Sequence, residues 1–147
     1  MNAALMEEMK QFLQREDNQS LVGSPASLEE IAAAERELQV AFHPDYVQFI
    51  ATFGGAYAGL AVHAFVNGSS IGRETVVELT QSFREQYRDL PFAEALQRGY
   101  VISLDGSGDP IFVDADGHVH ILYHDTGESR QLAESFEQLI ADNFVAW

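Results

Sequence analysis

Three histidines lie within seven residues of one another, at His118, His120 and His124. Along an extended strand, residues an even number of positions apart point to the same face. A His-x-His pair with a nearby carboxylate can bind zinc, so His118, His120 and a carboxylate define a possible small metal-dependent hydrolase. Exposed strand positions are also ordinary places for histidine. We favour that simpler interpretation and predict no metal site.

The longer stretch from Tyr100 to Asp125, which contains these histidines, also holds five aspartates, at Asp105, Asp109, Asp114, Asp116 and Asp125. Asp105 and Asp109 resemble a carboxylate pair for acid–base catalysis. They also flank Gly106-Ser107-Gly108, and aspartates hold turns of this kind by accepting backbone N–H groups. Turn formation therefore explains both residues, and we predict no catalytic residue.

A second aspartate motif, Asp114-Ala115-Asp116-Gly117, resembles the start of a calcium-binding loop. Such a loop needs further oxygen ligands and a glutamate about six positions after its glycine. The residues that follow, His118 to Tyr123, show an apolar strand pattern instead. Because Asp-Gly between apolar runs is a strong hairpin signal, we predict a hairpin turn here.

Other reaction classes lack the residues that they need. The chain has no cysteine, which excludes disulfides, thiolate metal ligands and a thiol nucleophile. Ser107 has no hydrolase elbow around it, and its glycine-rich turn joins two strands without the helix and lysine of a phosphate-binding loop. The eight Lys+Arg residues are scattered and form no basic patch for nucleic acid.

These candidate residues are carried by the stretch from Tyr100 to Asp125, which predicts an antiparallel meander. Its three strands are expected at Tyr100–Leu104, Ile111–Asp114 and His118–Tyr123. If the apolar residues of the last strand face the helices, then the three histidines face outward. They would line the uncovered face of the sheet, with Asp114 or Asp116 nearby.

Amphipathic helices are predicted before and after this sheet. Ser27 and Glu30 form a capping box, and Pro44 suits the first position of the next helix. The expected elements are helices at 3–15, 27–40, 44–53, 74–88 and 135–144, a loop at 17–26 and a strand at 60–66. This order predicts one α+β domain over residues 1–147, with an antiparallel sheet and helices mainly on one face.

Charge is the strongest compositional signal. Against 23 Asp+Glu the chain has 8 Lys+Arg, a net charge of −15, and residues 100–147 hold nine acids and one base. Such a chain repels nucleic acid and anionic membranes and attracts basic partners. Because no long apolar run and no signal-peptide pattern is present, we expect a cytoplasmic protein.

Two segments carry an ordered set of motifs. The first, SLEEIAAAERELQVAFHPDYVQFIATFGGAY, spans 27–57 and has a capped helix, a proline-containing break and a closing Gly-Gly. The second, VISLDGSGDPIFVDADGHVHILYHD, is followed by LAESFEQLI at 132–140. Together they resemble the SUKH superfamily, which joins fungal cell-wall synthesis regulators with bacterial immunity proteins. The resemblance covers 27–144 and leaves 1–26 as an N-terminal helix and loop. The chain departs from the family's usual Leu-Pro at Phe42-His43-Pro44, where the break is one residue longer.

The resemblance implies a protein-binding module without enzymatic activity or cofactor, most simply an immunity protein that neutralises a cognate toxin domain. The acidic balance fits a basic, nuclease-type toxin. A regulatory scaffold of the cell-wall-regulator type is the alternative. We expect a monomer or weak homodimer. The expected partner contacts are Asp105, Asp109, Asp114, Asp116, His118, His120, His124 and Asp125.

Overall fold

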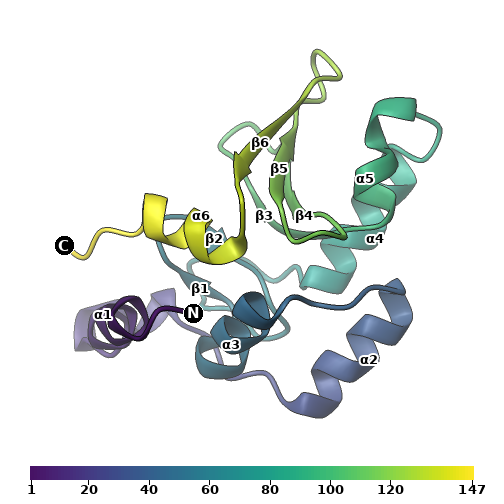
Figure 1. The fold of residues 1–147 in the computed structure, drawn as a ribbon. Coiled ribbons are helices and arrows are strands. Elements are labelled where there is room, and N and C mark those ends of the chain that lie inside the picture. Colours follow the sequence, from purple (N-terminus) through teal and green to yellow (C-terminus); the bar gives the residue numbers. More distant parts are fainter.

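The computed structural model describes residues 1–147 apart from the side chain of Phe92. Its helical segments are α1 (Ala3–Leu13), η1 (Glu16–Leu21), α2 (Leu28–Leu38), α3 (Pro44–Phe53), α4 (Val76–Gln86), η2 (Pro91–Ala93), α5 (Glu94–Gln97) and α6 (Phe136–Asn143). Its strands are β1 (Ala56–Tyr57), β2 (Ala61–Val62), β3 (Tyr100–Leu104), β4 (Pro110–Val113), β5 (Val119–Leu122) and β6 (Ser129–Ala133) (Figure 1). Among the described residues, no helix combines the length and hydrophobicity that crossing a membrane requires.

The main sheet is antiparallel and four-stranded, in the order β3-β4-β5-β6. The three strands of the expected meander are confirmed as β3, β4 and β5. Sequence patterns do not predict β6, because Ser129, Arg130 and Gln131 are exposed and show no apolar alternation. An edge strand can carry polar side chains, since backbone hydrogen bonds to one neighbour hold it. Here Ile121 pairs with Arg130, and Leu122 pairs with Ser129.

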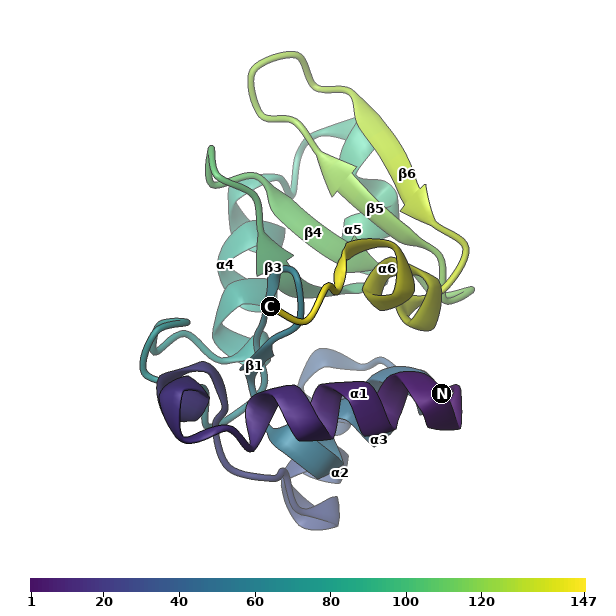
Figure 2. The same ribbon diagram turned by 90° about the vertical axis from the view of Figure 1, so that its left-hand side faces the viewer.

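Helices lie on both faces of this sheet. Figures 1 and 2 show α6 on one side and α4 with α5 on the other. The larger core contains Ile111, Val113 and Ile121 together with side chains of α1, α2, α3 and α6. A smaller core joins Val101 and Phe112, which face the opposite way, to residues of α4 and α5. The α+β architecture is confirmed, with the larger set of helices on one face.

Local signals set most helix boundaries. The predicted capping box of Ser27 and Glu30 is present at the start of α2. Pro44 occupies the first turn of α3, as expected. A second capping box, made by Thr75 and Glu78, starts α4 at Val76 and offsets the low helix propensity of its β-branched residues.

Two expected segments differ in the structure. The expected strand at 60–66 is reduced to β2, because Asn67 Oδ1 accepts the Ala64 N–H at 2.8 Å and draws the chain away from strand geometry. The expected loop at 17–26 begins with η1. Its buried Asn18 donates at 2.8 Å to the Phe12 carbonyl, which in the last turn of α1 otherwise accepts only the Arg15 N–H at 3.4 Å among the described backbone groups.

Candidate functional site

The predicted contact residues separate into two groups at opposite ends of β4 and β5. Because β4 and β5 are antiparallel, the residues before β4 lie beside those after β5, and the residues after β4 lie beside those before β5. Four residues at ~3.3 Å each place the groups roughly 13 Å apart. The β4–β5 group contains Asp114, Asp116, His118 and His120, and the His124 group contains Asp105, Asp109, His124 and Asp125.

Asp114 organises the β4–β5 group. Its Oδ1 accepts the backbone N–H groups of Asp116 and His118, both at 2.9 Å, and its Oδ2 lies 2.7 Å from His120 Nε2. Burial acts to raise the pKa of Asp114, but the hydrogen bonds from His120 and the two amides outweigh it, so the pKa lies below its usual value. Asp114 is thus a charged carboxylate that holds the predicted hairpin turn.

The expectation of one outward row of three histidines is wrong. His120 is half-buried and stacks on Phe112, with ring centroids 5.3 Å apart, at the margin of the face that α4 covers. β5 ends at Leu122, so the chain turns before His124, which lies with Asp109 in the other group. The strand-alternation argument fails because it assumed that the strand continues to residue 124.

Asp114, Asp116 and His118 form the cluster closest to a metal site among the described residues, with ligand atoms within 4.8 Å of one another. Both oxygens of Asp114 already have hydrogen-bond partners, the His118 N–H in the turn and the His120 ring on β5, which accounts for its position. Asp116 is exposed, and the predicted ligand His120 is held against Asp114. The geometry therefore gives no added support to the hydrolase alternative.

Asp109 organises the His124 group. It is only 4% exposed, and its Oδ1 accepts the His124 backbone N–H at 3.1 Å and contacts the ring Nδ1. The other ring nitrogen lies 2.9 Å from Asp125. Asp105 accepts the N–H groups of Ser107 and Asp109, both at 2.9 Å, as its predicted turn role requires. Asp109 itself does not cap that turn, because its carboxylate joins the β3–β4 turn to the end of β5.

This contact shifts the titration of both partners. The side-chain hydrogen bond to Asp109, its charge and those of Asp125 and Asp105 raise the pKa of His124. Burial acts to raise the pKa of Asp109, but the hydrogen bonds from the His124 ring and amide outweigh it, so the pKa lies below its usual value. A raised histidine pKa stabilises the fold below the unfolded value of about 6.5 and loses that effect as pH rises through the folded value.

We therefore expect His124→Gln to destabilise the protein more at pH ~6 than at pH ~9. The measurement is urea unfolding of both proteins across this range. His118→Gln is the matched control, because His118 Nδ1 lies 3.8 Å from its nearest carboxylate, too far for a direct hydrogen bond. A difference between wild type and His124→Gln that stayed constant with pH would show that the ion pair contributes nothing.

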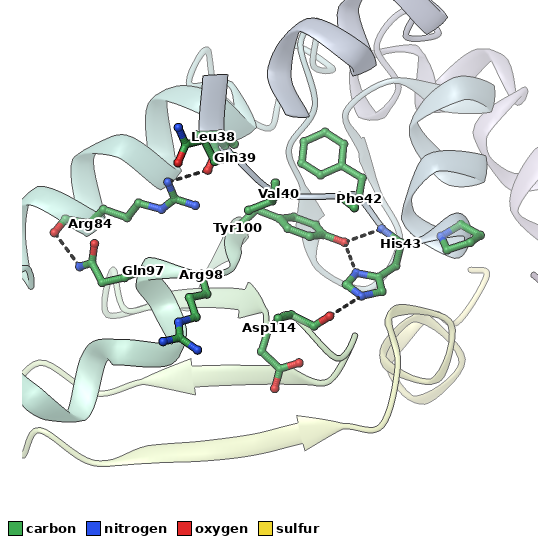
Figure 3. A pocket seen from close by; sticks show the side chains of 13 residues that line it. Leu38, Gln39, Val40, Phe42, His43, Arg84, Gln97, Arg98, Tyr100 and Asp114 are labelled. Carbon is green, nitrogen blue, oxygen red and sulfur yellow. Dashed lines mark hydrogen bonds between the residues drawn. The ribbon is translucent and has the colours of Figure 1, made fainter. Parts of the chain in front are cut away.

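A pocket of about 600 Å³ lies where the α2–α3 loop meets β3 and the β4–β5 turn (Figure 3). His43 closes one side of it. The His43 N–H donates to the Tyr100 hydroxyl at 3.0 Å, its ring Nδ1 lies 2.9 Å from the same hydroxyl, and its Nε2 lies 3.2 Å from the Ala115 carbonyl. Burial raises the pKa of Tyr100, so this hydroxyl stays protonated. In the sequence, the contact between His43 and Tyr100 coincides with the longer break at Phe42-His43-Pro44.

The basic side chains of this pocket have protein partners. Arg84 donates to the carbonyls of Leu38 and Gly99, each at 2.9 Å, and burial lowers its pKa. Arg98 is paired with Glu94 at 3.1 Å on the surface. Arg84 thus ties the end of α2 to the start of β3, and the pocket is built largely from contacts that hold the fold together.

A family model described as the SMI1 / KNR4 family (SUKH-1) matches residues 25–142. The match covers well over half of the chain, including all six strands, both groups of predicted contact residues and the pocket beside Tyr100. No match was found among curated proteins.

Proposed function

Because the chain belongs to the SMI1/KNR4 family (SUKH-1), we propose that it is an immunity protein, which binds a cognate toxin domain and neutralises it. Family membership is the observation that carries this proposal, since members are typically immunity proteins. The protein acts by occupying a surface of the toxin and uses no catalytic step of its own. We place its action in the cytoplasm, where an immunity protein binds the toxin before the toxin acts.

Charge supports a basic, nuclease-type toxin as the partner. The net charge is −15, and the C-terminal third carries nine acids against one base. Asp116 and Asp125 are exposed and Asp105 is half-exposed, so their charges act on an approaching partner. Charges of this kind raise the rate of association more than they raise affinity, and their effect falls with added salt.

The eight predicted contacts divide by role. Asp109 and Asp114 hold the chain together, and His120 is stacked on Phe112, so these three act on a partner only indirectly. The residues that remain available to a partner are Asp105, Asp116, His118, His124 and Asp125. We propose these five as the polar part of the toxin-binding surface.

The test is co-expression with the toxin domain encoded beside this gene. Growth should be restored, and the purified pair should bind with a nanomolar Kd and an on-rate that falls at least about tenfold as salt rises from ~0.05 to ~0.5 M. An unrelated basic nuclease serves as the control for non-specific attraction. Failure to restore growth and to form a complex would overturn the proposal.

A regulatory scaffold is the second candidate, because the matched family takes its description from SMI1/KNR4 proteins. Such a protein binds several partners weakly. A toxin gene next to this one favours the immunity role, and a signalling or secretion gene in its place favours the scaffold.

A further inference from the structure

A second hollow, of about 390 Å³, lies between the β1–β2 connection, the β3–β4 turn and the end of α6. Its sides come from segments far apart in sequence: 59–61, 104–106 and 139–143, with Leu132 of β6. We call it the α6 pocket. It adjoins the His124 group, because Asp105 belongs to both.

The floor of the α6 pocket is apolar. Leu60 and Leu132 are half-buried and pack against the larger core, which contains Ile111 and Leu139, exposed by 7% and 3%. Leu104 also lines the hollow but packs against the smaller core. Leu60 and Leu132 therefore keep apolar surface that the chain itself does not cover. A ligand group that buries such surface gains roughly 25 cal/mol for each Å².

The rim of the α6 pocket is acidic. Asp105 stands on the β3–β4 turn and Asp142 on α6, and no basic residue is among the described side chains that line the hollow. Asp105 accepts its two amide hydrogen bonds through Oδ1, and Asp142 accepts the Gln138 side chain at 2.7 Å, also through Oδ1. Within the described chain, the hydrogen bonds of both carboxylates thus use one oxygen, which leaves Oδ2 to accept from a partner.

We propose that the α6 pocket receives an arginine side chain from the protein's basic partner. The aliphatic stem of the arginine lies on Leu60 and Leu132, and the guanidinium lies between Asp105 and Asp142. For the identity of this partner the inference rests on the proposed function. It extends the binding surface to α6 and the β1–β2 connection, beyond the residues that sequence motifs single out.

Arginine fits this combination better than the other side chains do. An apolar side chain would leave two rim carboxylates facing a partner without a counter-charge. A lysine ammonium is compact and strongly hydrated, whereas the planar guanidinium offers five donors that can reach carboxylates on two different elements. Arginine is also among the residues that contribute most at protein interfaces.

The first experiment is an NMR titration of the ¹⁵N-labelled protein with N-acetyl-arginine amide and with its neutral isostere, N-acetyl-citrulline amide. We expect the arginine compound to shift the amide signals of Leu60, Gly106 and Asn143, and added salt to weaken the effect. Equal shifts from the citrulline compound would show an apolar pocket without charge selection and would overturn the proposal. So would the absence of shifts at these residues.

Two conservative variants test the rim. Asp105→Asn and Asp142→Asn keep an Oδ1 acceptor for the existing hydrogen bonds and remove only the charge. Each should weaken binding of the arginine compound by about two- to fivefold, and the double variant should weaken it by more than either single variant does. The two effects are not expected to multiply, because both carboxylates contact the same guanidinium. Asp89→Asn is the matched control and should change nothing, because Asp89 is 89% exposed between α4 and η2 and does not line the α6 pocket. Equal affinity in the wild type and the double variant would overturn the proposal.

The toxin complex separates this inference from the function on which it rests. If the wild type and the double variant bind the toxin domain equally, the α6 pocket takes no arginine of the toxin and the immunity function stands. If the wild type binds no toxin domain, the immunity function fails, while the NMR titration with the arginine and citrulline compounds still reports whether the pocket selects arginine.

Discussion

Phe136→Ala is expected to lower the free energy of unfolding by about 3–5 kcal/mol. Phe136 is fully buried at the first position of α6. Its ring makes edge contacts with Tyr46 and Phe49 of α3, with centroids 5.4 Å away in both cases. Truncation removes these contacts and leaves a cavity at the point where α6 joins α3. Since small domains are stable by about 5–15 kcal/mol, this single change removes a large share of the total.

Urea unfolding followed by circular dichroism gives the measurement. Leu28→Ala is the matched control, because Leu28 is 79% exposed and its truncation should change stability by no more than about 0.5 kcal/mol. A loss of less than about 1 kcal/mol for Phe136→Ala would mean that the core around α6 collapses around the cavity and that α6 contributes little to the fold.

Gly54→Ala is expected to destabilise the protein by at least about 2 kcal/mol. Gly54 ends α3 with φ +66° and ψ −147°, a conformation that residues with a side chain rarely adopt. A Cβ at this position would also fall far inside van der Waals contact of the Ser24 carbonyl oxygen. The neighbouring chain is tied there by the Gly23 N–H, which donates to the Gly55 carbonyl at 2.9 Å. Alanine at position 54 therefore destabilises the fold in two ways: its own backbone is strained, and the Ser24 backbone must move to make room.

Gly106→Ala provides the comparison for this prediction. Gly106 has no left-handed φ, and a Cβ built on it meets nothing within 4 Å. Alanine there should change stability by no more than about 0.5 kcal/mol in the same unfolding assay. Equal stabilities of the two variants would show that the backbone at residue 54 shifts at little cost.

Features that depend on neighbouring residues are predictable from the sequence. The capping box of Ser27 and Glu30, the proline start of α3 and the turn role of Asp105 are all present as expected. Each is made within four residues of chain, so local geometry alone decides it. Thr75 and Glu78 carry the same signal at the start of α4, where the β-branched residues obscured it.

Features that depend on distant pairing are not predictable in this way. β6 forms because its backbone pairs with that of β5, and its polar side chains do not indicate this pairing. Asp109 looks like a turn residue in sequence, yet its carboxylate contacts His124, fifteen positions away. The pocket beside Tyr100 depends on a hydrogen bond from His43, which is fifty-seven positions away.

The sequence by itself determined the α+β class, the family resemblance, the acidic balance and the residue types gathered between Tyr100 and Asp125. Only the tertiary structure decided how those residues are shared between two ends of a sheet, and that Asp105 and Asp142 of α6 line the same hollow. The physical reason is the sequence separation over which each kind of interaction acts. Turn and cap chemistry acts over a few residues, whereas a binding surface is assembled from segments that chain packing alone brings together.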